Sequence, residues 1–461
     1  MKLWRLHNLL DYWKKLTSGS VNRKILSAAI TVAFGTGLVK VMAALKEIVI
    51  AWKFGTGDEL DAFLIALLVP EFIINVVAGS FNAALIPTYI RVREQQGIKA
   101  AQRLFSGATV WSLGLLGITT IFIVASAPQY LPQLASGFSA EKISLTFKLL
   151  CVISPIVMLT GVVTIWSAVL NAGERFALTA LSPIITPIIT IVLLLFGAKF
   201  WGVFALGVGL VGGAFLEITL LGIALRRQKV SLLPRWYGFD DNLRQVASQY
   251  APMIAGGFLM CSTGIVDQAM AATLLPGSVA ALNYGNRLTA FPITLMTQAL
   301  STAVIPYFSK MVAHEDWVGV SQTLKRYMKS IFAAALPIAL LLIIFSEPIV
   351  KILFQRGLFT ANDTQLVANI QAFNALQIPL RGPGILVVRF ISATRSNQIL
   401  MWGSGFNLTI NIVLDYLFIQ WLGVAGIALS TSCVYIFSFF FLLFFAVKKL
   451  QKKAIVPNTS E

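Results

Sequence analysis

Residues 176–225 read FALTALSPIITPIITIVLLLFGAKFWGVFALGVGLVGGAFLEITLLGIAL, and this stretch decides the class of fold. It holds two apolar runs, 176–198 and 201–225, each long enough as a helix to cross a hydrocarbon layer about 30 Å thick. Similar runs recur from Ile25 to Val447. Of the 461 residues, 57% are hydrophobic and 12% are charged, and the mean hydropathy is +0.80. One soluble core cannot bury so many apolar side chains, so the chain is expected to be an all-α polytopic membrane protein.

The apolar runs predict about twelve transmembrane helices. They fall near 25–52, 60–90, 105–127, 143–171, 176–198, 201–225, 246–272, 280–308, 328–353, 366–392, 396–420 and 422–447. Lys and Arg are concentrated in the N-terminal segment, in alternate loops and in the C-terminal tail. Since cytoplasmic loops carry the excess of basic residues, both termini are expected in the cytoplasm. This distribution explains most of the net charge of +17, and no nucleic-acid partner is expected.

The two halves of the chain resemble one another, which indicates an internal duplication. AALIPTYI (83–90) matches TAVIPYFS (302–309), and LNAGERF (170–176) matches ISATRSN (391–397). Both halves enter the membrane from the same side, so parallel repeats forming two six-helix lobes around a central cavity are expected. The predicted parts are a cytoplasmic or interfacial N-terminal segment (1–24), an N-lobe (25–225), a cytoplasmic linker (226–245), a C-lobe (246–447) and a basic cytoplasmic tail (448–461).

Basic side chains inside the predicted spans are the first functional candidates. A charge near the bilayer centre costs about 2.5–3.5 kcal/mol on insertion scales, so it needs a function or a partner. Fixed cations lining a water-filled cavity would bind a pyrophosphate group through charge-assisted hydrogen bonds. Two structural alternatives stay open, namely extension of the side chain to the headgroups and pairing with Glu47, Asp61 or Glu71. The candidate cations are Lys40, Lys46, Arg287, Arg381 and Arg389.

A second candidate group is anionic and polar. Asp267 lies in the seventh predicted helix, and Asn411 and Asp415 lie four residues apart in the eleventh, on one helical face. Carboxylate and amide oxygens converging inside a protein would suit a monovalent cation or a proton. Polar contacts that merely hold helices together are the alternative. No cofactor is expected, because a nucleotide-binding glycine loop is absent and the three cysteines lie singly in apolar segments.

Several segments resemble one family along nearly the whole chain. FGTGDELDAFLIALLVPEF (54–72), followed by ALIP (84–87), resembles the second-helix signature of the MurJ/MviN lipid II flippases. LNAGERFALTALSPIITPI (170–188), YGNRLTAFP (284–292) and ILFQRGLFT (352–360) are similar to the same family. The resemblance places the chain in the multidrug/oligosaccharidyl-lipid/polysaccharide exporter superfamily, as a divergent member with twelve predicted helices where typical members have fourteen.

The resemblance implies a carrier that moves lipid II from the inner to the outer leaflet of the bacterial cytoplasmic membrane by alternating access. A membrane potential or an ion gradient would drive it, and proteins of cell-wall synthesis would be its partners. The positions that match the family's substrate-binding and gating residues are Lys40, Lys46, Asp61 and Arg287. The positions that match a sodium site found in some members are Asp267, Asn411, Asp415 and Thr431.

Other functions are weighed beside lipid II transport. Ile74, Asn286 and Ala290 replace charged residues of the family pattern, so another polyprenyl-linked saccharide is an alternative cargo. A cation-coupled exporter of small amphiphiles would need an acidic, aromatic-lined cavity, which the lysines in the spans disfavour. A membrane glycosyltransferase or ligase would need catalytic carboxylates or histidines beside a large outer loop. The predicted outer loops are short, and no enzymatic activity is expected.

Overall fold

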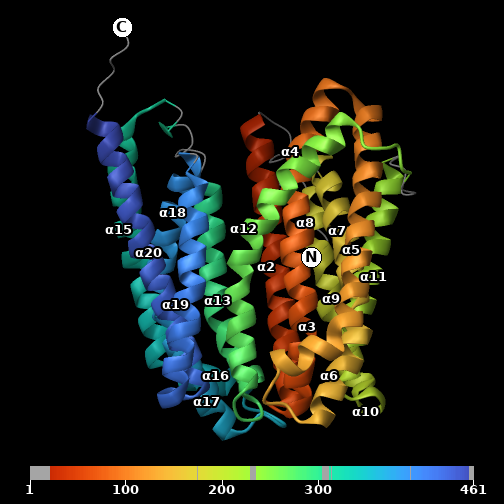
Figure 1. Ribbon diagram of the computed structural model, residues 1–461, viewed down its shortest axis with the longest axis vertical. Helices are drawn as coiled ribbons and strands as arrows, with labels where there is room; N and C mark the ends of the chain where they lie inside the picture. The colour runs from red at the N-terminus through yellow and green to blue at the C-terminus, as the bar shows by residue number, and fades with distance from the viewer. Residues whose placement is uncertain are drawn as a thin grey trace, which may run out of the picture. The chain divides into compact units, whose positions relative to one another are not determined.

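The computed structural model describes residues 21–173, 175–228, 235–303, 311–312, 314–394 and 396–455 (Figure 1). Within these ranges the secondary structure is helical and contains no strand, which confirms the all-α prediction. Most of the predicted N-terminal segment (1–24) lies outside the described residues. So do part of the linker (229–234), the repeat motif from 304 to 309 and the last six residues of the tail.

The described helices form two compact units. Unit 1 comprises the described residues up to Val49, Ile73–Ser126 and Lys148–Ile254. Unit 2 comprises Ile50–Phe72, Ala127–Phe147 and the described residues from Ala255 onward. Unit 2 thus contains the second half of the chain together with two short pieces of the first half. The six-helix lobes at 25–225 and 246–447 therefore stay a prediction.

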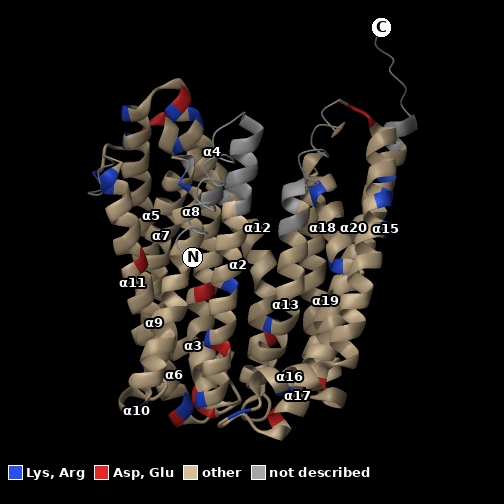
Figure 2. Cartoon of the chain, turned by 180° about the vertical axis from the view of Figure 1, so that it is seen from behind, with Lys and Arg blue, Asp and Glu red and all other residues tan. Residues whose placement is uncertain are grey.

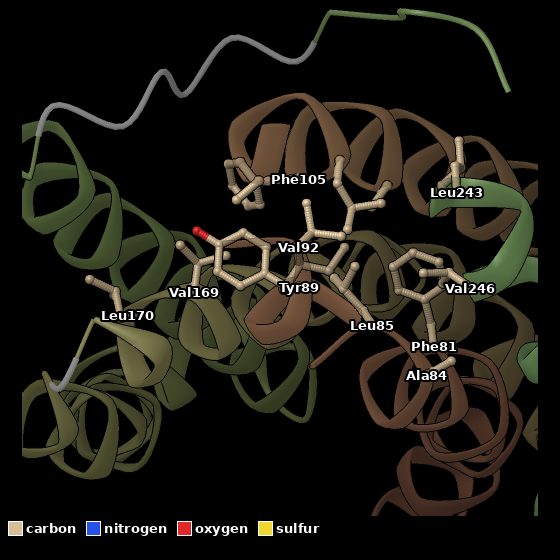
Figure 3. Close-up of a cluster of buried hydrophobic side chains, with 14 of the residues drawn as sticks. Phe81, Ala84, Leu85, Tyr89, Val92, Phe105, Val169, Leu170, Leu243 and Val246 are labelled. Carbon is tan, nitrogen blue, oxygen red and sulfur yellow. The ribbon is translucent and has the colours of Figure 1, made fainter. Parts of the chain in front are cut away.

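Unit 1 has its apolar core at one end of its helices. Bulky side chains of five helices meet there, with Phe81, Leu85 and Tyr89 all nearly inaccessible to solvent (Figure 3). The helices that make up most of this unit are α2 (Val21–Phe54), η1 (Ile74–Ala78), α4 (Gly79–Gln95), α5 (Ile98–Leu134), α6 (Ala140–Ile153), α7 (Pro155–Ala172), α8 (Phe176–Leu181), η2 (Ser182–Ile184), α9 (Ile185–Phe196), α10 (Ala198–Trp201), α11 (Phe204–Arg227) and α12 (Asp241–Ala272). The ends of α2, α5 and α12 and the start of α6 belong to unit 2.

Two long helical stretches are interrupted by other helix types. The helix that starts at Asp58 passes through the π-helix η1 four residues after Pro70, and the stretch from Phe176 to Phe196 contains the 3-10 turn η2. Pro183 lies in that turn. A proline lacks the backbone N–H and its ring crowds the preceding turn, so regular α-helix is difficult to continue there.

Unit 2 is built mainly from the helices of the second half of the chain. α19 and α20 run side by side as an antiparallel pair (Figure 1). Apolar side chains of α15, α18 and α20 form its largest described core. The helices are α3 (Asp58–Ile73), α13 (Ser278–Ala303), α15 (Trp317–Ile344), α16 (Ser346–Phe354), α17 (Ala361–Ala375), α18 (Ile378–Ala393), α19 (Asn397–Leu422) and α20 (Val424–Ile455).

The length and composition of the helices fit a multi-pass membrane protein. Among the described residues, eight helical stretches are long and apolar enough to cross a membrane. The expectation of about twelve is consistent with this number but not exact. α17 and α18 have 15 and 16 residues, so each alone covers less than a hydrocarbon layer of about 30 Å. Charged residues lie mostly towards the ends of the helices (Figure 2).

Candidate functional site

Four polar residues predicted to hold a cation lie together inside unit 2, and we call them the Asp267 cluster. The Nδ2 group of Asn411 donates a hydrogen bond of 2.9 Å to Oδ1 of Asp267. The hydroxyl of Thr431 donates to Oδ2 of the same carboxylate at 3.2 Å. Asp415 lies one turn after Asn411, faces Asp267 and is completely buried. Residues from α12, α19 and α20 thus share one polar centre within an apolar bundle.

The Asp267 cluster has the chemistry of a site for a small hard cation. Two carboxylates are buried within it, and Oδ1 of Asn411 has no hydrogen-bond donor among the described residues. A buried acceptor without a donor costs about 1–3 kcal/mol, and a bound cation would remove that cost. Among the described residues no group of three His, Cys, Asp or Glu side chains could hold a metal ion. Carboxylate, amide and hydroxyl oxygens are ligands of the kind that hard cations prefer.

Asp61 is the second polar centre of unit 2. Its carboxylate accepts hydrogen bonds from the backbone N–H groups of Gly277 and Ala280, at 2.7 and 2.8 Å. Lys142 completes the shell with a hydrogen bond of 2.9 Å to Oδ2 of Asp61 and also pairs with Asp58. Asp61 is 1% exposed, so these bonds are shielded from water. The carboxylate holds the start of α3 against the start of α13 and against α6.

Further hydrogen bonds join the same part of unit 2. The hydroxyl of Thr56 donates to Asp363, and that of Tyr284 donates to the backbone oxygen of Gly55 at 3.2 Å. The backbone N–H of Leu358 donates to the backbone oxygen of Trp52 at 3.1 Å. The segment 52–61 is therefore fixed to α13, α17 and the loops that precede them by both side-chain and backbone bonds.

The predicted cations have different environments. Lys40 on α2 of unit 1 is exposed and forms no ion pair with another described residue. Lys46 pairs with Glu47 at 3.1 Å, which is one of the structural alternatives foreseen from the sequence. Arg287 on α13 of unit 2 is exposed, and its Nε donates to Asn283 at 2.8 Å. Arg389 on α18 is exposed as well.

Arg381 differs from the other cations because it is stacked inside unit 2. Its guanidinium carbon lies 3.5 Å from the centre of the Tyr435 ring. Its Nη1 group is buried and has no hydrogen-bond partner among the described residues. Since the guanidinium group has five donors in a planar fork, an oxygen of an anionic ligand would be a suitable partner.

Two further buried or paired polar residues were not expected to have a role. Lys142 lies at the start of α6, and its ammonium group contacts Asp61 and lies 3.9 Å from the centre of the Phe138 ring. Local sequence gives no signal for a bond between residues 81 positions apart. Glu217 is buried in α11 and accepts a hydrogen bond from Ser182 at 2.8 Å. The sequence does contain a signal for Glu217, since Glu217 is a single acidic residue within a long apolar run.

Comparison with known proteins gives a consistent result. The family described as lipid II flippase MurJ matches residues 50–457. A probable lipid II flippase MurJ from Synechocystis is 25% identical over 437 residues, which cover 91% of this chain and 81% of the relative.

Solved structures show the same fold. A lipid II flippase MurJ in an inward closed conformation superposes with a TM-score of 0.78 and 22% identity, covering 92% of this chain and 90% of the other. An inward-facing multidrug resistance MATE family transporter of the MOP superfamily superposes with a TM-score of 0.76 and 14% identity, covering 94% and 100%. Because the family match extends over most of the chain, the protein belongs to the MurJ lipid II flippase family.

Proposed function

We propose that this protein is a transporter, not an enzyme, that moves a polyprenyl-pyrophosphate-linked saccharide across a membrane, with lipid II as the first candidate cargo. The observation that carries the proposal is the presence of Lys40 and Arg287, exposed cations on membrane helices, in a chain of the lipid II flippase family. Each can give charge-assisted hydrogen bonds to phosphate oxygens. Transport from the inner to the outer leaflet would proceed by alternating access between two conformations.

The candidate residues have different proposed roles. Lys40, Arg287 and Arg381 bind phosphate oxygens at stages of the transport cycle, and the unpaired Nη1 of Arg381 supports its inclusion. Lys46 contributes less, because Glu47 already neutralises it. Asp61 acts in gating, since its bonds to Gly277, Ala280 and Lys142 must break before the start of α3 can leave α13.

Sodium is the proposed coupling ion. Asp267, Asp415 and Asn411 would supply oxygen ligands, and the Thr431 hydroxyl would complete the set. Bound Na⁺ would neutralise part of the charge of two carboxylates that face one another in a buried site. The alternation of basic loops supports a location in the bacterial inner membrane with both termini in the cytoplasm. Proteins of cell-wall synthesis are proposed partners.

Reconstitution tests the transport proposal. The purified protein is placed in liposomes with fluorescent lipid II, and the fraction that a membrane-impermeant quencher reaches is followed over time. The wild type is expected to flip the lipid. A charge-assisted hydrogen bond contributes about 1.5–3 kcal/mol, so Lys40→Ala and Arg287→Ala are expected to slow flipping roughly tenfold or more. Lys53→Ala, at the end of α2, is the matched control. Wild-type rates in both the Lys40→Ala and Arg287→Ala variants would contradict the assigned roles. An inactive wild type would contradict the function.

A further inference from the structure

Glu217 is a buried acid that the transport proposal does not use. It lies in the middle of α11, an otherwise apolar helix until Arg226, and only 6% of its surface is exposed. Ser182 donates its hydroxyl hydrogen to Oε1 of Glu217 at 2.8 Å. Ser182 itself is 1% exposed. The carboxyl group is thus enclosed within unit 1, with one hydroxyl as its polar partner among the described residues.

Among the described residues, no cation lies close enough to Glu217 to compensate a negative charge on it. The elements packed along this part of α11 are α7, α9 and η2, and none of them contains a charged residue. α6 reaches α11 near Gly207, about 15 Å along the helix from Glu217. No charged group among the described residues acts on the carboxyl group. Other titratable groups on the surrounding elements are Tyr89 in the core cluster, Cys151 on α6, Lys199 on α10, Arg226 and Arg227 at the end of α11, and Lys40 on α2, which packs against α8 at Gly35.

Ser182, the hydrogen-bond partner of Glu217, lies where a long helical stretch is interrupted. Ser182 opens the 3-10 turn η2, and Pro183 within that turn interrupts the regular hydrogen bonding between α8 and α9. On the same face of α11, Gly209 and Gly213 let the helix approach Thr190 and Thr186 so closely that no side chain fits. The close contact between α11 and α9 therefore shields the carboxyl group on one side. On the other side, the carboxyl group lies next to the interruption between α8 and α9.

We propose that Glu217 is a proton-binding site of unit 1, which is protonated in the enclosed conformation and releases its proton when the α8–η2–α9 stretch opens to water. A carboxylate without a cation is costly inside a membrane, whereas a carboxylic acid that also accepts a bond from Ser182 is not. Uptake forms an O–H bond on the carboxyl group at the expense of a hydronium ion, and release returns the proton to water. Proton movement through unit 1 would then accompany the transport cycle.

Infrared difference spectroscopy tests proton binding without depending on the proposed function. The spectrum of the wild type minus that of Glu217→Gln, recorded in membranes at neutral pH, is expected to contain the C=O band of a protonated carboxylic acid. Glutamine has nearly the same shape as the protonated side chain and is expected to fold. Ser182→Ala should keep the band but shift it, because the hydrogen bond to the carbonyl oxygen is lost. A difference spectrum with carboxylate bands and no carboxylic acid band would overturn the proposal.

The coupling itself rests on the proposed transport function, and liposomes of different internal pH test it. Wild-type flipping is expected to change at least severalfold with an imposed proton gradient, while Glu217→Gln is expected not to respond. A Glu217→Gln protein that keeps the wild-type response would refute the coupling. A wild type that does not flip lipid II at all would instead refute the transport proposal, while the infrared band would still report on the proton site.

Discussion

Asp61 is the residue whose loss should affect unit 2 most clearly. Three donors converge on one nearly inaccessible carboxylate, and two of them are backbone groups that cannot turn elsewhere without moving α13. Asp61→Asn removes the negative charge and replaces one acceptor oxygen by a donor. Hydrogen bonds to a charged group contribute about 1.5–3 kcal/mol each, so the folded protein is expected to lose roughly that amount of stability. Thermal unfolding in detergent measures the change.

Glu59→Gln provides the control for Asp61→Asn. Glu59 is an exposed acid in the same first turn of α3, so its substitution is expected to change stability by less than about 0.5 kcal/mol. Equal unfolding temperatures for the Asp61→Asn and Glu59→Gln variants would show that the bonds of Asp61 do not stabilise unit 2.

Sodium should stabilise the wild type through the Asp267 cluster. A ligand present at a hundred times its dissociation constant stabilises the folded state by about 2.7 kcal/mol. Asp267→Asn removes a ligand charge and is expected to abolish the shift in unfolding temperature that Na⁺ causes. Thr409→Val is the control, because its exposed hydroxyl bonds only to its own helix. A sodium-dependent shift that survives in Asp267→Asn would place the ion elsewhere.

The sequence indicates some of these residues and not others, for physical reasons. Asp267, Asn411 and Asp415 stand out as polar residues in apolar spans, and family resemblance adds Thr431. The structure brings Asn411 and Thr431 within hydrogen-bonding distance of Asp267. Lys142 has no such signal, since its bond to Asp61 depends on how distant helices pack. The pairing of Lys46 with Glu47 is an intermediate case, because ion pairing with Glu47 is one of the structural alternatives that the sequence leaves open.

At the scale of helices, the close contact between α9 and α11 bears on the proposed role of Glu217. A Cβ atom at Gly213 would lie 2.5 Å from the backbone Cα of Thr186. At Gly212, next in sequence, the nearest atom would be an ordinary 3.9 Å away. Gly213→Ala must push the helices apart and is expected to destabilise the protein by about 1–3 kcal/mol. Gly212→Ala should be neutral or gain up to about 1 kcal/mol of helix propensity.

Thermal unfolding of the two glycine variants side by side checks this expectation. Because both carry the same substitution one residue apart on one helix, any general effect of alanine on α11 cancels in the comparison. A Gly213→Ala protein as stable as Gly212→Ala would mean that the two helices separate easily, and the sealing of Glu217 would lose its basis.

The apolar pattern predicts where the helices lie better than it predicts where they are interrupted. Every predicted span from 25–52 to 422–447 contains helix in its described residues. The span expected at 366–392 is two helices, α17 and α18, separated near Gln377. Pro379 is compatible with either a bend in one helix or the start of a new helix, so the sequence pattern alone does not distinguish the two. The π-helix η1 at Ile74–Ala78 also has no local signal beyond Pro70.

At the scale of the whole molecule, the chain combines a family match over residues 50–457 with polar centres placed inside otherwise apolar units. Fold class and family were predictable from the sequence, because apolar runs and motif order extend over the whole chain. Neither the fold class nor the family determines the cargo, because the choice of cargo depends on which cations contact the headgroup of the transported lipid. Lipid II transport is the central claim and needs a test on the intact protein.

Complementation is the most direct test. A bacterium is depleted of its own lipid II flippase, the full chain is expressed at a confirmed level in its inner membrane, and lipid II in the outer leaflet is measured. Lys40→Ala and Arg287→Ala proteins serve as matched variants. The account predicts that the wild type restores outer-leaflet lipid II and growth, while the variants restore much less. Wild-type protein that is present in the membrane but leaves lipid II in the inner leaflet would contradict the account.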